Sequence, residues 1–400
     1  MGETVDCVVA GHISLDITPH MLSGGSSVAE ILRPGKLIVV GAPTISTGGA
    51  VCNTGFPLRR LGMNVKLIAK CGDDMLGRVL LDLIRREAPG AEAGMQVVPG
   101  ETTSFTVVIN PPGIDRMFLH CPGANDTFAS ENIDLAVVRQ ARLFHLGYPP
   151  LMARTYADGG AELIRIYQQV RAAGTTTSLD VAYPDPASPA GKQDWTAILS
   201  RTLPHVDIFT PSAEELTFML LRRRHDELVA RAAGSELLGV MDGDLLGELA
   251  NRCIEYGAAV VLIKCGYLGV YVRTAGRGRL ERIGRTKPGN LANWTNRELF
   301  EPSYGVEKVV STTGAGDCAI AGFLAAYLRG CDLDDAVRYA CAVGAQNVTV
   351  ADSISGVRSW EQTVEQVRSR PPKNDVTIPL SRWRYDESAA HYVGPRDGKV

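Results

Sequence analysis

The stretch Lys308-Val-Val-Ser-Thr-Thr-Gly-Ala-Gly-Asp-Cys-Ala-Ile-Ala-Gly-Phe-Leu-Ala-Ala-Tyr-Leu-Arg-Gly330 leads from a short β-branched run through a glycine turn into a helix of small residues. A helix start leaves several backbone N–H groups unpaired, and glycines ahead of it let the backbone close on an anion. Asp317, in the first helical turn, stays ionised in the field of the helix N-terminus, which suits a residue that takes a proton from an alcohol. The turn therefore predicts a site that binds a transferring phosphate and activates its acceptor.

Two other interpretations fit the same turn. Gly-Ala-Gly-Asp can be only a tight strand-to-helix connection with an N-terminal acidic residue. Gly314, Gly316 and Ala319 also match the dinucleotide-binding pattern G-x-G-x-x-A after a strand. Two observations weigh against dinucleotide binding: the turn comes late in the chain, and the next acidic residues follow Gly330 at a helix end, where a ribose-binding carboxylate is not expected. An aspartate inside the turn would also repel a pyrophosphate.

Length, charge and cysteine usage limit the class of protein. The chain has 400 residues, enough for one large α/β domain with insertions, and a formal net charge of −3 gives no reason to expect nucleic acid or an anionic membrane as a partner. Its 9 cysteines are odd in number, scattered and never spaced C-x-x-C, so neither a disulfide framework nor a zinc site is indicated. The N-terminus lacks signal-peptide features and no apolar run is long enough to span a membrane. We expect a cytoplasmic protein.

The first part of the chain reads as a strand followed by a possible ligand-binding edge. Residues 5–10 form a compact apolar run that ends in a turn, and Asp16 follows it. Strands of open α/β sheets present ligand-binding groups at their carboxyl ends, so Asp16 is placed to accept hydrogen bonds from hydroxyl groups, although it can also simply cap a turn. Residues 36–40 are expected to form a short strand and residues 42–49 a polar loop.

Gly48 and Gly49 precede a second helix of small residues, expected over 50–62. The start of this helix again offers free N–H groups, which predicts a second binding edge. Asn53, one turn into the helix, can point its amide toward the same ligand, or it can be an ordinary buried polar residue.

A predicted hairpin interrupts the alternation of strands and helices. Residues 102–109 and 116–121 have strand-like patterns, and residues 110–115 between them have hairpin turn chemistry. An antiparallel ribbon inserted into a parallel fold has to bury one face, so the hairpin covers a ligand or pairs with a second subunit. Arg116 on the hairpin can pair with a sugar acid, or it can face solvent or another subunit.

The later part of the chain contains one more candidate ligand-binding segment and several candidate insertions. The strand expected at 206–210 runs into Pro211-Ser-Ala-Glu-Glu215, which indicates a metal-positioning or phosphate-positioning edge but also describes a routine helix start. Residues 222–251 resemble a charged helical elaboration, and residues 274–300 a surface insertion. Residues 371–400 have little periodicity and are expected to form a tail on the surface, or to be partly disordered.

Five segments, 41–62, 72–77, 210–215, 264–269 and 311–330, resemble in their order the motifs of the ribokinase-like (PfkB) carbohydrate kinases. The most specific is Thr-Thr-Gly-Ala-Gly-Asp followed by Ala-Gly-Phe. The resemblance implies a doubly wound, mostly parallel α/β sheet with helices on both faces, in a kinase domain of residues 1–370. It also implies a small β-sheet lid made from residues 13–40 and 97–121. ATP and Mg²⁺ would be the co-substrates, and phosphate would move to a hydroxymethyl group.

The resemblance assigns roles to individual residues. By similarity Asp317 is the base, and the backbone N–H groups of the anion hole belong to Gly314, Ala315 and Gly316. Positions that hold the sugar in the family are matched by Asp16, Gly48, Gly49 and Asn53. Positions near the nucleotide and its metal are matched by Gly266 and Gly269 in the nucleotide loop, by Asn347 at an adenine contact and by Glu215, the acid that orders Mg²⁺.

Two positions depart from the family pattern. Ser311 stands where the family commonly has an aspartate that helps to bind a monovalent cation, so potassium activation is not predicted. Ser212 replaces the asparagine of the N-x-x-E motif. We expect a sugar kinase rather than a nucleoside kinase of the same fold, because the lid carries few aromatic residues, only Phe105 and Phe118. A non-catalytic sensor of nucleotide or sugar is the alternative of a different class. A homodimer formed through the lid hairpin is a further expectation.

Overall fold

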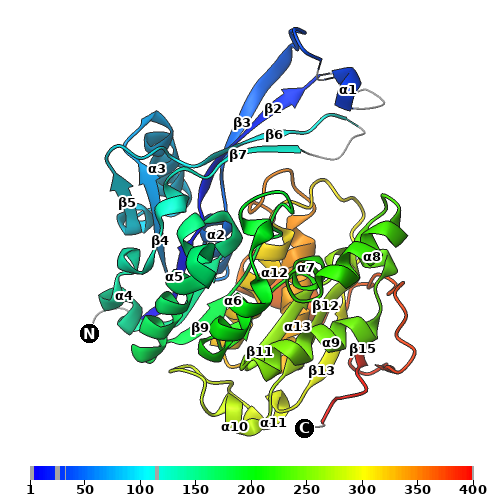
Figure 1. Cartoon of the computed structure of the whole chain (residues 1–400). Coiled ribbons are helices and arrows are strands. Elements are labelled where there is room, and N and C mark those ends of the chain that lie inside the picture. Colours follow the sequence, from blue (N-terminus) through cyan, green and yellow to red (C-terminus); the bar gives the residue numbers. More distant parts are fainter. Residues whose placement is uncertain (1–3, 23–27, 32, 113–116, 399–400) are drawn as a thin grey trace.

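Helices cover both faces of one large sheet. The computed structural model describes residues 4–22, 28–31, 33–112 and 117–398. Within these residues eleven strands form a sheet in the order β14-β15-β13-β12-β11-β10-β9-β8-β1-β4-β5 (Figure 1). The strand bounds are β1 Val5–Gly11, β4 Val65–Gly72, β5 Met95–Val98, β8 Ala141–Gly147, β9 Thr176–Leu179, β10 Ile208–Phe209, β11 Val260–Lys264, β12 Gly269–Thr274, β13 Glu298–Pro302, β14 Arg384–Asp386 and β15 His391–Val393.

Most of this sheet is parallel. The strands from β11 to β5 run parallel to their neighbours, whereas β12, β13, β15 and β14 pair in antiparallel fashion. The direction changes at β12 because the link between β11 and β12 is only a short turn, and parallel strands need a long crossover. Gly269 fits this turn: its φ is 125°, and a Cβ there would lie 2.0 Å from the carbonyl oxygen of Glu301. The predicted mostly parallel sheet is confirmed.

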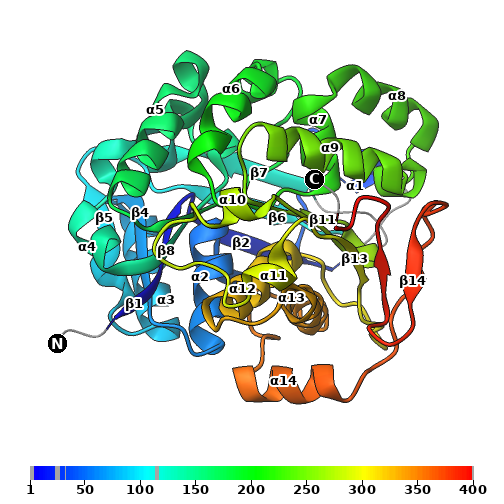
Figure 2. The same cartoon turned by 90° about the horizontal axis from the view of Figure 1, so that it is seen from below.

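Two groups of helices cover the two faces, as the view along the sheet in Figure 2 shows. One face carries α2 Ala50–Arg60, α3 Met75–Glu87, α12 Ala315–Leu328, α13 Leu333–Asn347 and α14 Trp360–Arg368. The other carries α4 Leu135–Gln140, α5 Ala153–Ala172, α6 Trp195–Thr202, α7 Ala213–Leu220, α8 Arg222–Ala232 and α9 Gly243–Glu255. Each face has its own buried apolar cluster. This confirms the doubly wound arrangement. Among the described helices, none combines the length and apolarity that a membrane crossing requires.

Helix α12 is buried along nearly its whole length because almost all of its side chains are apolar. It packs against α2 and α13. The approach to α13 is close: a Cβ on Gly322 would lie 2.5 Å from the carbonyl oxygen of Tyr339. The small residues that mark this helix in the sequence therefore let two neighbouring helices hold its first turn firmly against the sheet.

A second sheet of four strands projects from the large one (Figure 1). Its order is β3-β2-β6-β7, with bounds β2 Ser14–Met21, β3 Val40–Gly48, β6 Phe105–Ile109 and β7 Met117–Cys121. The predicted antiparallel hairpin is present as β6 and β7. The rest of the prediction needs correction: residues 42–49, expected to be a loop, contribute most of β3, whereas residues 36–39 are irregular.

The lid strands consequently lie at residues 14–21, 40–48, 105–109 and 117–121, whereas the expected lid segments were 13–40 and 97–121. The edge strand β3 was missed because it is mostly polar and exposed, so it lacks the apolar alternation of a strand packed on a core. The expected lid segment began too early at 97, since β5 pairs with β4 in the large sheet. Arg116 lies outside the described residues.

Three further segments differ in part from what their sequence patterns suggest. The run ahead of α12 is not a strand: Val309 and Val310 are irregular and exposed. The presumed surface insertion 274–300 leads into β13, every residue of which is buried in the sheet. The expected tail does lie mostly on the surface, but its described residues, 371–398, also form β14 and β15, and β15 pairs with β13. These short strands form because they pair with segments far away in the sequence, and a local sequence pattern does not reveal such pairing.

Candidate active site

The glycine turn at the start of α12 is held in one conformation by contacts on two sides. Gly314 precedes the helix with a φ of 74°, and a Cβ there would lie 2.6 Å from the Cβ of Ser353. Asn347, fully buried at the end of α13, donates from Nδ2 to the carbonyl oxygen of Thr313 at 2.7 Å. The backbone that follows is therefore fixed before any ligand arrives, as an anion-binding helix N-terminus requires.

Asp317 is buried in the first turn of α12, with its carboxylate held by neighbouring side chains. The hydroxyl of Tyr148 donates to Oδ1 at 2.8 Å and to Oδ2 at 2.7 Å. The hydroxyl of Thr54 lies 3.5 Å from Oδ1. Burial raises the pKa of Asp317, and the positive charge of Lys264 together with hydrogen bonds from Tyr148 and Asn53 opposes that rise. A carboxyl group with a raised pKa and fixed geometry is suited to proton transfer.

Lys264 brings a positive charge close to this carboxylate. It ends β11, and its Nζ lies 2.6 Å from Oδ1 of Asp180, which follows β9. Burial alone would lower the pKa of Lys264, but attraction to Asp180 and Glu215 raises it overall. Burial raises the pKa of Asp180, and Lys264 counters that effect. Within the described part of the chain, Oδ2 of Asp180 is buried without a hydrogen-bond partner.

Glu215 completes this charged group from the start of α7. Its Oε2 accepts from the backbone N of Ser212 at 2.6 Å, and its own backbone N donates to Oγ of Ser212 at 3.2 Å. This reciprocal capping box explains how serine serves at a position where the family commonly has asparagine. Glu215 also lines the main cavity.

A second polar group lies at the root of the lid. Asp16 on β2 accepts from Oγ of Ser14 at 2.8 Å, and burial raises its pKa. Gly48 lies directly against it, since a Cβ there would be 2.2 Å from Oδ2 of Asp16. Gly49, with a φ of 84°, leads into α2, whose Asn53 hydrogen-bonds to Asp317. The predicted acceptor-binding residues and the predicted base are thus neighbours.

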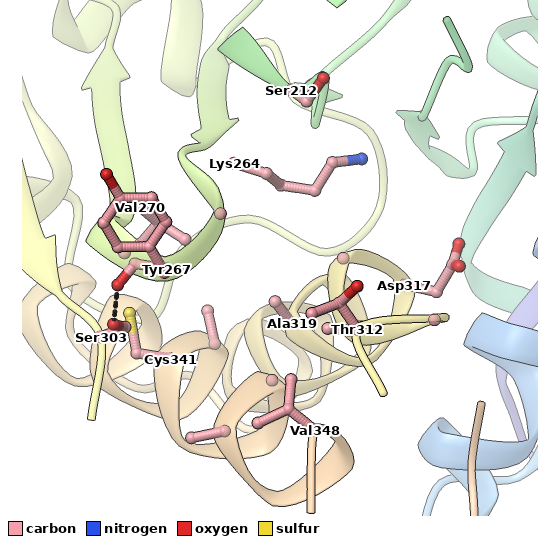
Figure 3. Close-up of a pocket in the computed structure, with 18 of the residues that line it drawn as sticks. Ser212, Lys264, Tyr267, Val270, Ser303, Thr312, Asp317, Ala319, Cys341 and Val348 are labelled. Carbon is pink, nitrogen blue, oxygen red and sulfur yellow. Dashed lines mark hydrogen bonds between the residues drawn. The ribbon is translucent and has the colours of Figure 1, made fainter. Parts of the chain in front are cut away.

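A cavity of about 540 Å³ opens on the other side of Asp317. In Figure 3 Asp317 lies at one end of it, Lys264 points into the middle, and Tyr267 and Ser303 lie at the opposite end. The predicted site residues that line it are Gly314, Ala315, Gly316, Asp317, Glu215, Gly266 and Gly269. Asn347 was expected to touch adenine; it is instead fully buried beneath the glycine turn, where its amide supports Thr313. That expectation misread a supporting residue as a ligand contact.

Three residues of the site were not singled out from the sequence: Tyr148, Asp180 and Lys264. Each stands at or directly after the carboxyl end of a parallel strand, namely β8, β9 and β11. Since ligands of open α/β sheets bind at these strand ends, strand position was the signal that could have found them.

Comparison with known proteins gives a consistent result. A family model described as pfkB family carbohydrate kinase matches residues 13–360. An uncharacterized sugar kinase of Archaeoglobus fulgidus is 27% identical over 289 residues, covering 72% of this chain and 93% of that protein. Fructokinase-2 of Zea mays is 27% identical over 238 residues, covering 58% and 67%.

Solved structures show the same fold. Arabidopsis thaliana ribokinase complexed with ribose and ATP superposes with a TM-score of 0.66 at 19% identity, covering 92% of this chain and 99% of that one. A putative ribokinase II from E. coli in complex with ATP and Mg²⁺ has a TM-score of 0.62 at 19% identity, with 91% and 99% covered.

Proposed function

This chain belongs to the pfkB family of carbohydrate kinases, and from that membership we propose that it transfers the γ-phosphoryl group of ATP to a hydroxymethyl group of a sugar or sugar-derived substrate. The observation that carries the proposal is the position of Asp317. It lies between the lid-side group around Asp16 and the cavity that also holds Gly314 and Lys264. One carboxylate therefore has an acceptor-binding group on one side and a phosphate-binding turn on the other.

In this mechanism Asp317 takes the proton of the acceptor hydroxyl as the oxygen attacks the γ-phosphorus of ATP, and ADP leaves. The backbone N–H groups of Gly314, Ala315 and Gly316 stabilise the charge on the migrating phosphoryl group. Lys264 adds a positive charge on the cavity side. Phosphoryl transfer depends mainly on positioning and charge stabilisation, so these groups suffice with a metal ion.

The carboxylates near the cavity fit a Mg²⁺ ion. Glu215 faces the cavity, and the buried Oδ2 of Asp180 lacks a partner among the described residues. Mg²⁺ in kinases is typically held by one or two carboxylates together with phosphate oxygens and water. The ion would neutralise the phosphates of ATP. Glu215, which lines the cavity, would hold it.

The acceptor would be held by Asp16, Gly48, Gly49 and Asn53. A carboxylate and an amide at the root of the lid provide hydrogen-bond partners for several hydroxyl groups, which a sugar supplies. The lid would close over the acceptor and exclude water, the competing acceptor for phosphate. Phe118 on the lid is exposed and Phe105 packs against the core of the main domain, so these two phenylalanines do not form a stacked pair for a nucleobase.

A panel of acceptors tests this function. Purified protein with ATP and Mg²⁺ is incubated with sugars, sugar acids and nucleosides, and ADP release is measured against a blank without acceptor. We expect turnover with at least one sugar or sugar acid. ADP release only with nucleosides would favour a nucleoside kinase. ATP binding without ADP release for any acceptor would favour a sensor.

We further propose that two copies pair through the lid. Its sheet exposes the apolar side chains of Ile45 and Leu119, which the strand register places in one row on the same face, and a second lid can cover this face. Light scattering at working concentration is expected to give twice the mass of the chain. A monomer at that concentration would contradict the pairing.

A further inference from the structure

A segment beyond the family-matched region contributes to the cavity. The match to the family ends at residue 360, yet Asn374 is part of the cavity lining. It stands at the base of the segment that continues into β14 and β15. This part of the cavity wall is therefore formed by a segment that lies outside the match to the family.

Asn374 is fixed to the cavity wall by its backbone and its side chain. Its backbone N donates to the carbonyl oxygen of Ser303 at 2.8 Å. Its Nδ2 donates to Oγ of Ser303 at 2.9 Å and to the carbonyl oxygen of Tyr267 at 3.2 Å. A carbonyl oxygen only accepts hydrogen bonds, so the amide nitrogen must face Tyr267 and the amide oxygen must face away from it. Oδ1 is thereby left as an acceptor.

A buried ion pair anchors the same segment. Lys373 pairs with Glu301 on β13, whose side chain is fully buried, and it also bridges to the backbone of Tyr304. Such a pair holds its two residues together, because separating them would leave an unpaired charge in the protein interior. Asn374 is therefore a preset part of the wall rather than a side chain on a free tail.

The end of the cavity that holds Asn374 suits a planar base. Asp317 and the glycine turn lie at the opposite end (Figure 3), so a nucleotide whose γ-phosphate reaches the turn extends toward Tyr267 and Ser303. The intervening walls carry apolar side chains and backbone, including those of Val270, Val306, Cys341, Ala345 and Val348. Apolar walls with few polar groups are typical of pockets for flat heterocycles.

We propose that Asn374 recognises the nucleotide base, with Oδ1 accepting a hydrogen bond from the 6-amino group of adenine. This inference rests on the proposed use of ATP. Adenine presents an amino donor at the position where guanine presents a carbonyl acceptor, so an amide oxygen fixed there accepts adenine and repels guanine. The C-terminal segment is then a determinant of ATP over GTP.

The test compares ATP, GTP and purine riboside triphosphate, which lacks only the 6-amino group, in the full-length protein and in Asn374→Ala. Dissociation constants come from calorimetry and kcat/KM from ADP release, or release of the matching diphosphate. For the unmodified protein we expect ATP to be preferred over both other nucleotides. For Asn374→Ala we expect the ATP preference to fall by about fivefold, the effect of one neutral hydrogen bond, with little change for purine riboside triphosphate. The exposed neighbour serves as control, and Asp375→Ala is expected to change nothing.

The outcomes separate this inference from the proposed function. Equal losses for all three nucleotides in Asn374→Ala, or no loss, would overturn base recognition while turnover still supported the kinase. Equal binding of ATP and purine riboside triphosphate by the unmodified protein would also overturn base recognition. This result needs no variant, so it can be obtained even if Asn374→Ala does not fold. Selective binding of ATP that depends on Asn374, in a protein without turnover, would support the inference and contradict the kinase.

Discussion

Asp317→Asn is expected to lower kcat by a factor on the order of 10² or more and to leave the dissociation constant for ATP nearly unchanged. Asparagine has the shape of aspartate and keeps one oxygen for the hydroxyl of Tyr148, which now contacts both carboxylate oxygens. It cannot accept a proton from the acceptor. The glycine turn and Lys264 remain in place, so nucleotide binding is retained while proton removal is lost.

The comparison requires kcat from ADP release and ATP affinity from calorimetry on the same preparations. Asp335→Asn is the matched control, because Asp335 also lies in the first turn of a helix, α13, where its side chain is half exposed and pairs only with Arg338 among the described residues. The control is expected to retain full turnover. If Asp317→Asn also retained it, Asp317 would not be the base.

The glycine turn and its helix could be predicted because the information is local. Glycine at a positive φ, unpaired helical N–H groups and an acid in the first turn are all properties of a few consecutive residues. Gly314 and Asp317 lie as the prediction requires. The same locality explains the failures at β3 and β15, because a polar edge strand and a three-residue strand become recognisable only through their pairing with distant segments.

The candidate site shows the same division. Glu215 and Gly266 could be associated with Asp317 because their segments match motifs of one family in the expected order. Tyr148 and Lys264 stand at similar strand ends, and that position is the one signal that could have found them, because the residue types alone do not distinguish them from structural residues. For Asn347 the prediction named a ligand contact where the structure has a supporting residue. An asparagine that is buried beneath the turn and one that faces a base cannot be told apart in the sequence.

Lys264→Met is expected to lower kcat by about 10² to 10³, the usual cost of removing one preorganised group that stabilises transition-state charge. Lys264 lines the cavity together with Glu215 and Asp317, so its ammonium would offset the charge on the phosphates of ATP. Methionine keeps much of the side-chain volume and removes the charge together with the N–H donors.

The same substitution is expected to move the pH dependence in a defined direction. Burial raises the pKa of Asp317 and Lys264 opposes that rise, so removal of Lys264 raises the pKa further. Asp317 acts as a base only when ionised, so activity is present above its pKa and is lost as the pH falls through it. The acidic limb of the profile of kcat against pH should therefore shift to higher pH in Lys264→Met.

A double variant separates this electrostatic role from a structural one. Lys264→Met alone leaves the buried carboxylate of Asp180 without its partner, and breaking a buried ion pair costs about 3–5 kcal/mol of stability. Asp180→Asn combined with Lys264→Met removes both charges, so chemical denaturation should show a stability closer to that of the unmodified protein. If Lys264 acts on the phosphates and on Asp317, the double variant still has low kcat and a shifted acidic limb. If it recovered both, Lys264 would serve only to neutralise Asp180.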